Sequence, residues 1–198
     1  MTQRTLWIVD GSYLYKSSSQ RFDYLLLKKE LQNVLRTSFY ESYFFNSVQR
    51  PPADGQDSFH SWLKLAPPQG PQMRVMLYSQ KDLRSECPAC GHKYDRQVQK
   101  GVDVAIATTM MKLAFKDRFD RLVLSAGDGD FEEVVDYIKT ELGKGLVLAG
   151  FRDTVSPDLQ CYADQIIWID RFLDKIAKPA NNQGERSGKG EKGRGQSN

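Results

Sequence analysis

The sequence predicts an α/β fold with a mostly parallel central sheet that is covered by helices on both faces. Short, continuously apolar runs at residues 6–9 and 122–124 are typical of strands that are buried on both faces. Such runs alternate with longer segments of helical periodicity, as they do in βαβ units. The chain has 198 residues, of which 40% are hydrophobic, so it can bury a core without disulfides.

The individual elements follow from apolar runs and their spacing. Strands are expected at residues 6–9, 39–45, 73–78, 122–124, 146–148 and 166–169. Helices are expected at residues 25–35, 59–65, 102–115 and 131–142, where apolar side chains recur at helical spacing. The Pro67-Pro68 pair would stop the second helix, and Glu132 and Glu133 suit the positive dipole end of the last one.

Charge and composition narrow the class of protein. The net charge of +3 lies in residues 178–198, so the rest of the chain is neutral and any nucleic-acid affinity must be local. We expect one domain over residues 1–177 and a disordered Gly/Lys/Arg tail over 178–198, which either touches phosphates or only aids solubility. No apolar run approaches the ~18 residues of a membrane span. With three cysteines and no apparent leader, a reducing cytoplasm is the expected location.

Four aspartates are expected at one edge of this sheet. Asp10 directly follows the first strand, Asp128 and Asp130 follow the strand at 122–124, and Asp103 stands at the start of the helix at 102–115. Active-site crevices in such sheets lie beyond the carboxyl ends of the strands. Clustered carboxylates repel each other unless a cation neutralises them, and Mg²⁺ or Mn²⁺ suits oxygen ligands. Such an ion activates water for attack on phosphorus, so the pattern favours phosphodiester hydrolysis.

Each aspartate also has an ordinary structural explanation. Asp10 can end a strand in a turn, and Asp103 can stabilise its helix through the dipole. Asp128 and Asp130 can cap the helix that follows them. Both interpretations stay open at this stage, although four such acids at one edge favour a shared metal site.

Three motifs carry a resemblance to a known family. Ile8-Val9-Asp10-Gly11, residues 100–105 (KGVDVA) and residues 125–131 (SAGDGDF) resemble, in this order and spacing, the NYN (LabA-like) domains of the PIN-like nuclease superfamily. The resemblance implies a three-layer α/β/α sandwich. It also implies an endoribonuclease that cleaves RNA with Mg²⁺ or Mn²⁺ and leaves a 3′ hydroxyl and a 5′ phosphate. The matching metal ligands would be Asp10, Asp103 and Asp128, with Asp130 as a further catalytic residue.

Two positions depart from the family pattern. Tyr13 stands where members commonly have Asn, and Thr109 stands where they often have a further Asp. A second hypothesis is therefore a non-catalytic RNA-binding or regulatory module with a weakened metal site. A third, phosphoacceptor signalling through Asp10 or Asp128, lacks a recognisable receiver pattern.

Substrate contacts are expected from the segment before the Asp103 helix. Lys100 and Arg96 would bind phosphates of a single-stranded or structured small RNA, Tyr94 would stack on a base, and Ser125 would contribute a hydroxyl. A solvated charged loop and a strand-end hydrogen bond are the plain alternatives.

The segment 87–92 (CPACGH) resembles half of a zinc knuckle. Cys87, Cys90 and His92 would supply up to three ligands, within a loop insertion at about residues 85–96. Cys161, His60 or a second chain would have to supply the rest, which leaves a homodimer open. Structural zinc, plain reduced thiols and a redox pair all remain open.

Overall fold

The computed structural model describes residues 3–48, 55–86, 88–98 and 101–178, without the side chains of 81–83 and 95–98. Its elements in chain order are β1 (Thr5–Asp10), α1 (Gly11–Ser17), α2 (Tyr24–Leu35), β2 (Phe39–Val48), α3 (Gln56–Lys64), β3 (Arg74–Ser79), β4 (Lys81–Glu86), β5 (Lys93–Val98), α4 (Val102–Phe115), β6 (Arg121–Ser125), η1 (Gly129–Phe131), α5 (Glu132–Thr140), β7 (Gly145–Gly150), α6 (Pro157–Gln160), β8 (Gln165–Trp168), η2 (Ile169–Phe172) and α7 (Leu173–Ile176).

The central sheet has six strands in the order β3-β2-β1-β6-β7-β8, and every neighbouring pair is parallel. The chain moves outward from β1 through β2 to β3, and then from β6 through β7 to β8 on the other side. The strand order therefore reverses between β1 and β6. Ligands of open parallel sheets bind beyond the carboxyl ends of the strands at such a switch point. The predicted α/β class and parallel sheet are confirmed.

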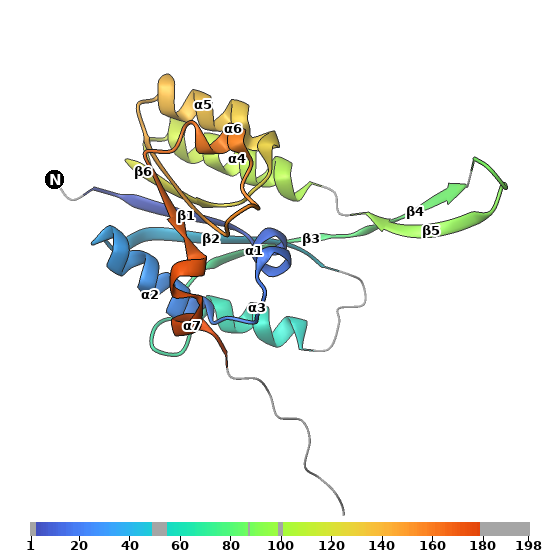
Figure 1. Ribbon diagram of the computed structural model, residues 1–198, viewed down its shortest axis with the longest axis horizontal. Coiled ribbons are helices and arrows are strands. Elements are labelled where there is room, and N and C mark those ends of the chain that lie inside the picture. Colours follow the sequence, from blue (N-terminus) through green and yellow to red (C-terminus); the bar gives the residue numbers. More distant parts are fainter. Residues whose placement is uncertain (1–2, 49–54, 87, 99–100, 179–198) are drawn as a thin grey trace, which may run out of the picture.

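Two apolar cores lie on the two faces of the sheet. Leu6 and Ile8 of β1 pack toward α4, α5 and α6, whereas Trp7 and Val9 pack toward α1, α2, α3 and α7. This follows from the alternation of side chains along a strand. Figure 1 shows the resulting three layers, with α4, α5 and α6 on one side of the sheet and the other helices on the opposite side.

The sequence had suggested a loop between β3 and α4, but this segment contains two strands. Lys81–Glu86 and Lys93–Val98 form an antiparallel hairpin with the register Glu86 to Lys93. It projects away from the sandwich (Figure 1). Its strands contain few apolar residues, so hydrophobic periodicity could not reveal them. The available signal was opposite charge across the strands, as in the Lys93–Glu86 ion pair at 3.9 Å.

Residues that lie outside the description include most of the predicted tail, from 179 onward. Lys178, the first residue of that expected tail, belongs to the folded body. Its amide donates to the Arg21 carbonyl at 3.0 Å, and its Nζ lies 4.9 Å from the centre of the Trp62 ring. Among the described residues, no helix is long and apolar enough to cross a bilayer.

His60 on α3 is part of the core. It is 3% exposed, lies against the rings of Phe44 and Phe59, and has no hydrogen-bond partner for either ring nitrogen among the described residues. Burial lowers the pKa of its imidazole below the ordinary 6.5, partly offset by Asp57. The buried ring is therefore neutral at pH 7.

The lowered pKa of His60 predicts a loss of stability in acid. As the pH falls below about 6.5, the unfolded chain takes up a proton that the folded chain does not, so the free energy of unfolding decreases. The slope from this one group is at most about 1.4 kcal/mol per pH unit. The free energy of unfolding, measured with urea between pH 7 and 5, should change less steeply with pH in His60→Leu than in the wild type. Equal slopes would contradict the buried, neutral imidazole.

Candidate functional site

Asp10 lies where β1 passes into α1. Its Oδ1 accepts hydrogen bonds from the amides of Ser12 at 2.9 Å and Tyr13 at 3.1 Å, so it caps the N-terminus of α1. Only 8% of the residue is exposed. The cap engages Oδ1 and fixes the side chain at the switch point.

Asp103 reaches the same edge of the sheet from α4. It lies in the first turn of this helix, after Gly101, whose φ of 85° is a left-handed conformation that glycine adopts without strain. The helix α4 packs against both β1, which ends at Asp10, and η1, which Asp128 caps.

Asp128 and Asp130 lie in the turn after β6. Asp128 caps η1, and its Oδ1 accepts a hydrogen bond from the Asp130 amide at 3.1 Å. Both residues are exposed. Since Val9 pairs with Ser125 across β1 and β6, Asp10 and this turn leave neighbouring strands at the same level.

The four carboxylates influence one another electrostatically. Burial raises the pKa of Asp10, and the negative charge of Asp103 raises it further. Although Asp103 as a residue is exposed, partial desolvation of its carboxyl group raises its pKa, and Asp128 and Asp130 add to the rise. Lys16 on α1 partly offsets both effects. Within the part of the chain that the structure describes, this negative charge is only partly neutralised.

Acids at the opposite edge of the sheet behave in the opposite way. Asp120 accepts hydrogen bonds from the Arg4 guanidinium, which lowers the pKa of Asp120 to about 2. Asp117 pairs with Arg4 and Lys144, and its pKa is lowered as well. Acids with raised pKa values thus gather at the carboxyl edge, which is where function is expected.

The carboxylates do not close into one compact cluster. Among the described residues, no group of three or more His, Cys, Asp or Glu side chains is close enough to hold a metal ion. The structure brings the predicted aspartates to one edge, but a cage of several carboxylates around one ion is not present in the part of the chain that it describes.

The residues expected to contact substrate lie in different surroundings. Ser125 is fully buried, and its Oγ accepts a hydrogen bond from Trp7 Nε1 at 3.1 Å. This agrees with the strand-end alternative, and a substrate contact by Ser125 stays a prediction. Arg96 lies on β5, opposite Leu83. Lys100 falls outside the described residues.

Tyr13 is the residue of this edge that sequence reasoning undervalued. Its hydroxyl bonds to Thr154 Oγ1 at 2.8 Å and accepts the Phe151 amide at 3.2 Å, so α1 is tied to the loop after β7. A Cβ on Gly127 would overlap the Tyr13 ring, and one on Gly150 would overlap its hydroxyl. Two glycines thus make room for the Tyr13 side chain at this edge of the sheet.

The sequence matches the NYN domain over residues 4–170. The chain belongs to the NYN-domain family. The match is to the domain as a whole, so the LabA-like subtype stays a prediction. The fold of this NYN domain is a PIN-like nuclease fold, which the parallel sheet and its flanking helices display.

Comparison of structures agrees on the fold. The crystal structure of a protein of unknown function from Vibrio parahaemolyticus is similar to this NYN domain with a TM-score of 0.64 and 20% sequence identity, over 89% of this chain and 97% of the other. No curated protein matches the sequence. At this identity the likeness concerns the fold alone.

The cysteine motif of this NYN domain lies away from the carboxylates. Cys90 and His92 are exposed at the tip of the projecting hairpin, and Cys87 lies outside the described residues. His60 is buried on one face of the sheet, whereas Cys161 follows α6 on the other face and donates to the Asp158 carbonyl at 3.0 Å. Neither residue lies near the hairpin tip, so a zinc site there stays a prediction that needs ligands from elsewhere.

The raised pKa of Asp10 predicts that its charge costs stability. A carboxylate whose pKa is raised by folding is less stable when ionised in the folded state than in the unfolded state, at every pH above that raised value. Asp10→Asn keeps the capping oxygen and removes the charge. We expect a Tm higher by about 2–4 °C at pH 7, equivalent to about 1 kcal/mol for a chain of this size, by differential scanning calorimetry.

Asp120→Asn is the matched control. Because the pKa of Asp120 is lowered by Arg4, removal of that charge should decrease the Tm. A decrease in both variants would show that Asp10 is a structural acid and would contradict the interpretation of the carboxyl edge.

Proposed function

We propose that this NYN-domain protein is an endoribonuclease that hydrolyses RNA phosphodiester bonds with Mg²⁺ or Mn²⁺. The observation that supports this most is the rise in the pKa of Asp10 and Asp103, caused by burial and by the neighbouring carboxylates at the switch point of a PIN-like sheet. Such charge is retained at a cost in stability where a cation or substrate needs it.

The donor set fits a divalent cation that is held by few protein ligands. Mg²⁺ commonly binds through one or two carboxylates, together with waters and substrate phosphates, and does not need a cage of protein ligands. Asp10 and Asp103, whose charges influence each other, would hold such an ion together with Asp128. When bound, the cation supplies positive charge to the phosphoryl oxygens and lowers the pKa of water at the site.

The protein side chains prepare this edge for a phosphate. Asp10 is fixed by its two amide hydrogen bonds, so it has little freedom to lose on binding. The hydrogen bond from the Asp130 amide to the Asp128 carboxylate holds a short turn, in which both residues face solvent. Lys16, whose charge acts on both Asp10 and Asp103, provides attraction for the RNA backbone, a role that the sequence had assigned to Lys100.

A second candidate function is a non-catalytic RNA-binding or regulatory module. Tyr13 fills part of the crevice above Gly127, and Thr109, half-buried on α4, brings no negative charge. Together with the missing compact cluster, these features favour a weak metal site. The two functions share the RNA partner and differ only in turnover.

The free thiols agree with a reducing compartment. Cys90 and Cys161 are exposed and not in disulfides, a state that favours the cytoplasm. We propose this location together with the function.

The test is cleavage of labelled single-stranded and hairpin RNA with Mn²⁺, with Mg²⁺ and with EDTA. The wild type should cut only with a divalent cation and leave 5′ phosphates. Asp128→Asn should lower the rate by ~100-fold or more, since a charged group at the ion is worth several kcal/mol. Asp174→Asn, an exposed acid on α7, is the control and should keep the wild-type rate.

Three outcomes would reject the nuclease mechanism. Cleavage in EDTA, or equal rates for Asp128→Asn and the wild type, would remove the carboxylates from the reaction. RNA binding without turnover at any cation concentration would establish the non-catalytic module instead.

A further inference from the structure

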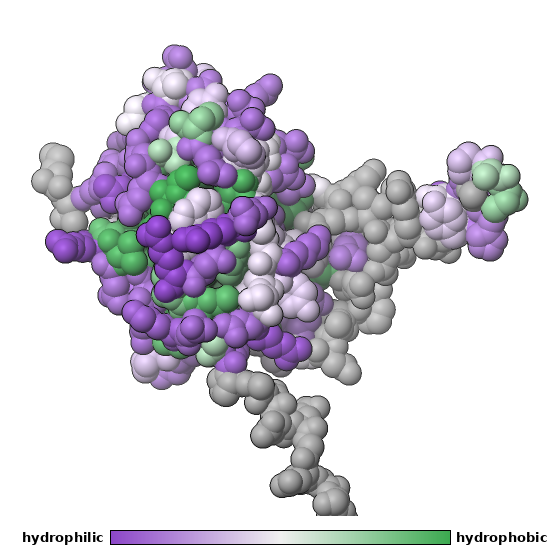
Figure 2. Space-filling model, viewed as in Figure 1, coloured by the Kyte–Doolittle hydropathy of each residue, from purple (hydrophilic) through white to green (hydrophobic). Residues whose placement is uncertain are grey.

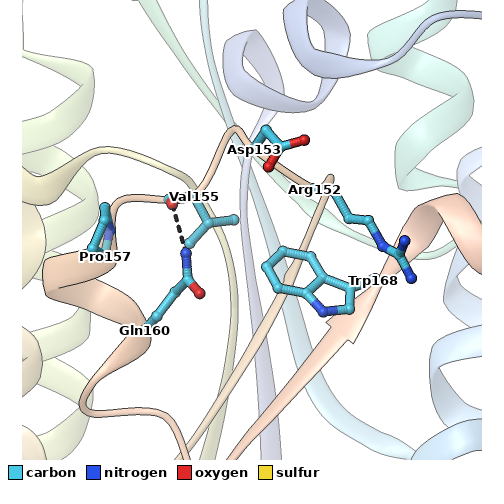
Figure 3. Close-up of a pocket in the computed structure, with 6 residues that line it drawn as sticks. All are labelled: Arg152, Asp153, Val155, Pro157, Gln160 and Trp168. Atoms are coloured by element: carbon cyan, nitrogen blue, oxygen red, sulfur yellow. Dashed lines mark hydrogen bonds between the residues drawn. The ribbon is translucent and has the colours of Figure 1, made fainter.

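A pocket lies at the carboxyl edge of the sheet, on the side of β7 and β8. It is an open pocket of about 480 Å³ between the loop after β7, α6 and the end of β8. Figure 3 shows the indole ring of Trp168 on one side, with Val155, Pro157 and Gln160 across from it and Asp153 at the rim. The volume lies within the range of sites for small molecules, so the pocket can hold a nucleotide-sized group.

The loop that forms the pocket is fastened to both carboxylate-bearing segments. The Ser156 amide donates to the Gly127 carbonyl at 2.9 Å, one residue from Asp128. On the other side, Tyr13 lies three residues after Asp10 in the chain. Its hydroxyl accepts a hydrogen bond from the Phe151 amide and bonds to Thr154. The pocket is therefore held at a fixed place next to the site where a phosphate would bind.

The lining suits a flat, neutral group better than a phosphate ion. Trp168 is half-buried, with its ring packed against the core, so it offers a rigid aromatic surface. The positive charge of Arg152 is matched by the negative charge of Asp153, both exposed. A lone phosphate would find no excess of positive charge here, whereas bases stack on tryptophan in every sequence context.

Gln160 and Asp153 present acceptors to the pocket, whereas the guanidinium of Arg152, a donor, points away from Gln160 past the indole ring (Figure 3). The Nε2 of Gln160 donates to the Val155 carbonyl at 2.9 Å (dashed line in Figure 3), so its amide oxygen is the group turned to the pocket. Asp153 adds two carboxylate oxygens. Acceptors pair with the exocyclic amino groups of cytosine and adenine, whereas the carbonyl at the same position of uracil would face them unpaired.

We propose that this pocket binds one unpaired base of RNA, stacked on Trp168, and prefers cytosine or adenine to uracil. The proposal rests on the proposed function in one respect, that the base belongs to an RNA whose phosphate lies at the carboxylates. Base binding itself requires no cation and no turnover. It would give the enzyme a sequence preference next to the cleaved bond.

The test is tryptophan fluorescence in EDTA during titration with hexacytidylate and hexauridylate, two single-stranded RNAs of equal length and charge. Trp7 is fully buried and Trp62 lies on α3, on the opposite face of the sheet, so quenching by a stacked base reports on Trp168. We expect quenching by hexacytidylate with about tenfold tighter binding than hexauridylate, within the range that one base contact supports.

Three variants separate the contributions. Trp168→Leu keeps an apolar side chain but removes the aromatic face, and should lose the quenching and about tenfold in affinity. Asp153→Asn, at an exposed position, adds a hydrogen-bond donor and should reduce the difference in affinity between the two RNAs. This result does not depend on whether Trp168→Leu folds. Trp62→Phe is the control and should bind as the wild type does.

The outcomes distinguish this proposal from the ribonuclease. Equal affinity for the two RNAs, or unchanged binding by Trp168→Leu, would overturn the base pocket even if the protein cuts RNA with Mn²⁺. Quenching that prefers cytosine and persists in Asp128→Asn, in a protein that cleaves nothing, would keep the pocket and reject the nuclease.

Discussion

The rest of this protein depends on one constraint, which is negative charge at one edge of a parallel sheet that the described residues neutralise only in part. Asp10 is nearly buried, and its pKa is raised by that burial and by Asp103. At the other edge, Asp120 is paired with Arg4 and has a pKa of about 2. The same residue type is thus stabilised by partners at one end of the strands and left without sufficient compensation at the other. The divalent cation of the proposed function would restore the balance and attract phosphate.

The fold explains how distant residues reach that edge. All six strands are parallel, so their carboxyl ends lie together, and the order reverses between the strands that precede Asp10 and Asp128. Tyr13 then joins the first helix to the loop after β7. Figure 2 shows a mostly hydrophilic surface, with hydrophobic residues in separate small patches on the face in view.

Local patterns were sufficient for the central elements. The apolar run at residues 6–9 and the helical stripe at 102–115 correspond to β1 and α4, because burial on both faces or on one stripe leaves a periodic signature. The hairpin at Lys81–Val98 leaves none, since backbone pairing rather than apolar burial holds it together. The short helix α1 also escaped notice, although Asp10 before Gly11 is a recognisable cap.

The candidate site divides in the same way. The positions of Asp10, Asp103 and Asp128 at one edge follow from strand ends and a helix start, which the sequence contains. Other features join residues that are far apart in the sequence. Ser125 bonds to Trp7 and Tyr13 packs over Gly127, in each case across more than a hundred positions. The pocket beside Trp168 is built from several segments. No local pattern encodes such contacts. Their prediction requires the packed structure.

The most direct measurement is an NMR titration of the carboxyl carbons of Asp10 and Asp103 without divalent cations, repeated with Mg²⁺ and in Asp128→Asn. Both residues should titrate above the ordinary 3.8, Asp103 should fall back toward it in Asp128→Asn, and Mg²⁺ should lower both pKa values. If both residues titrate near 3.8 and respond to neither change, the carboxyl edge carries no shared charge, and the site proposed here does not exist.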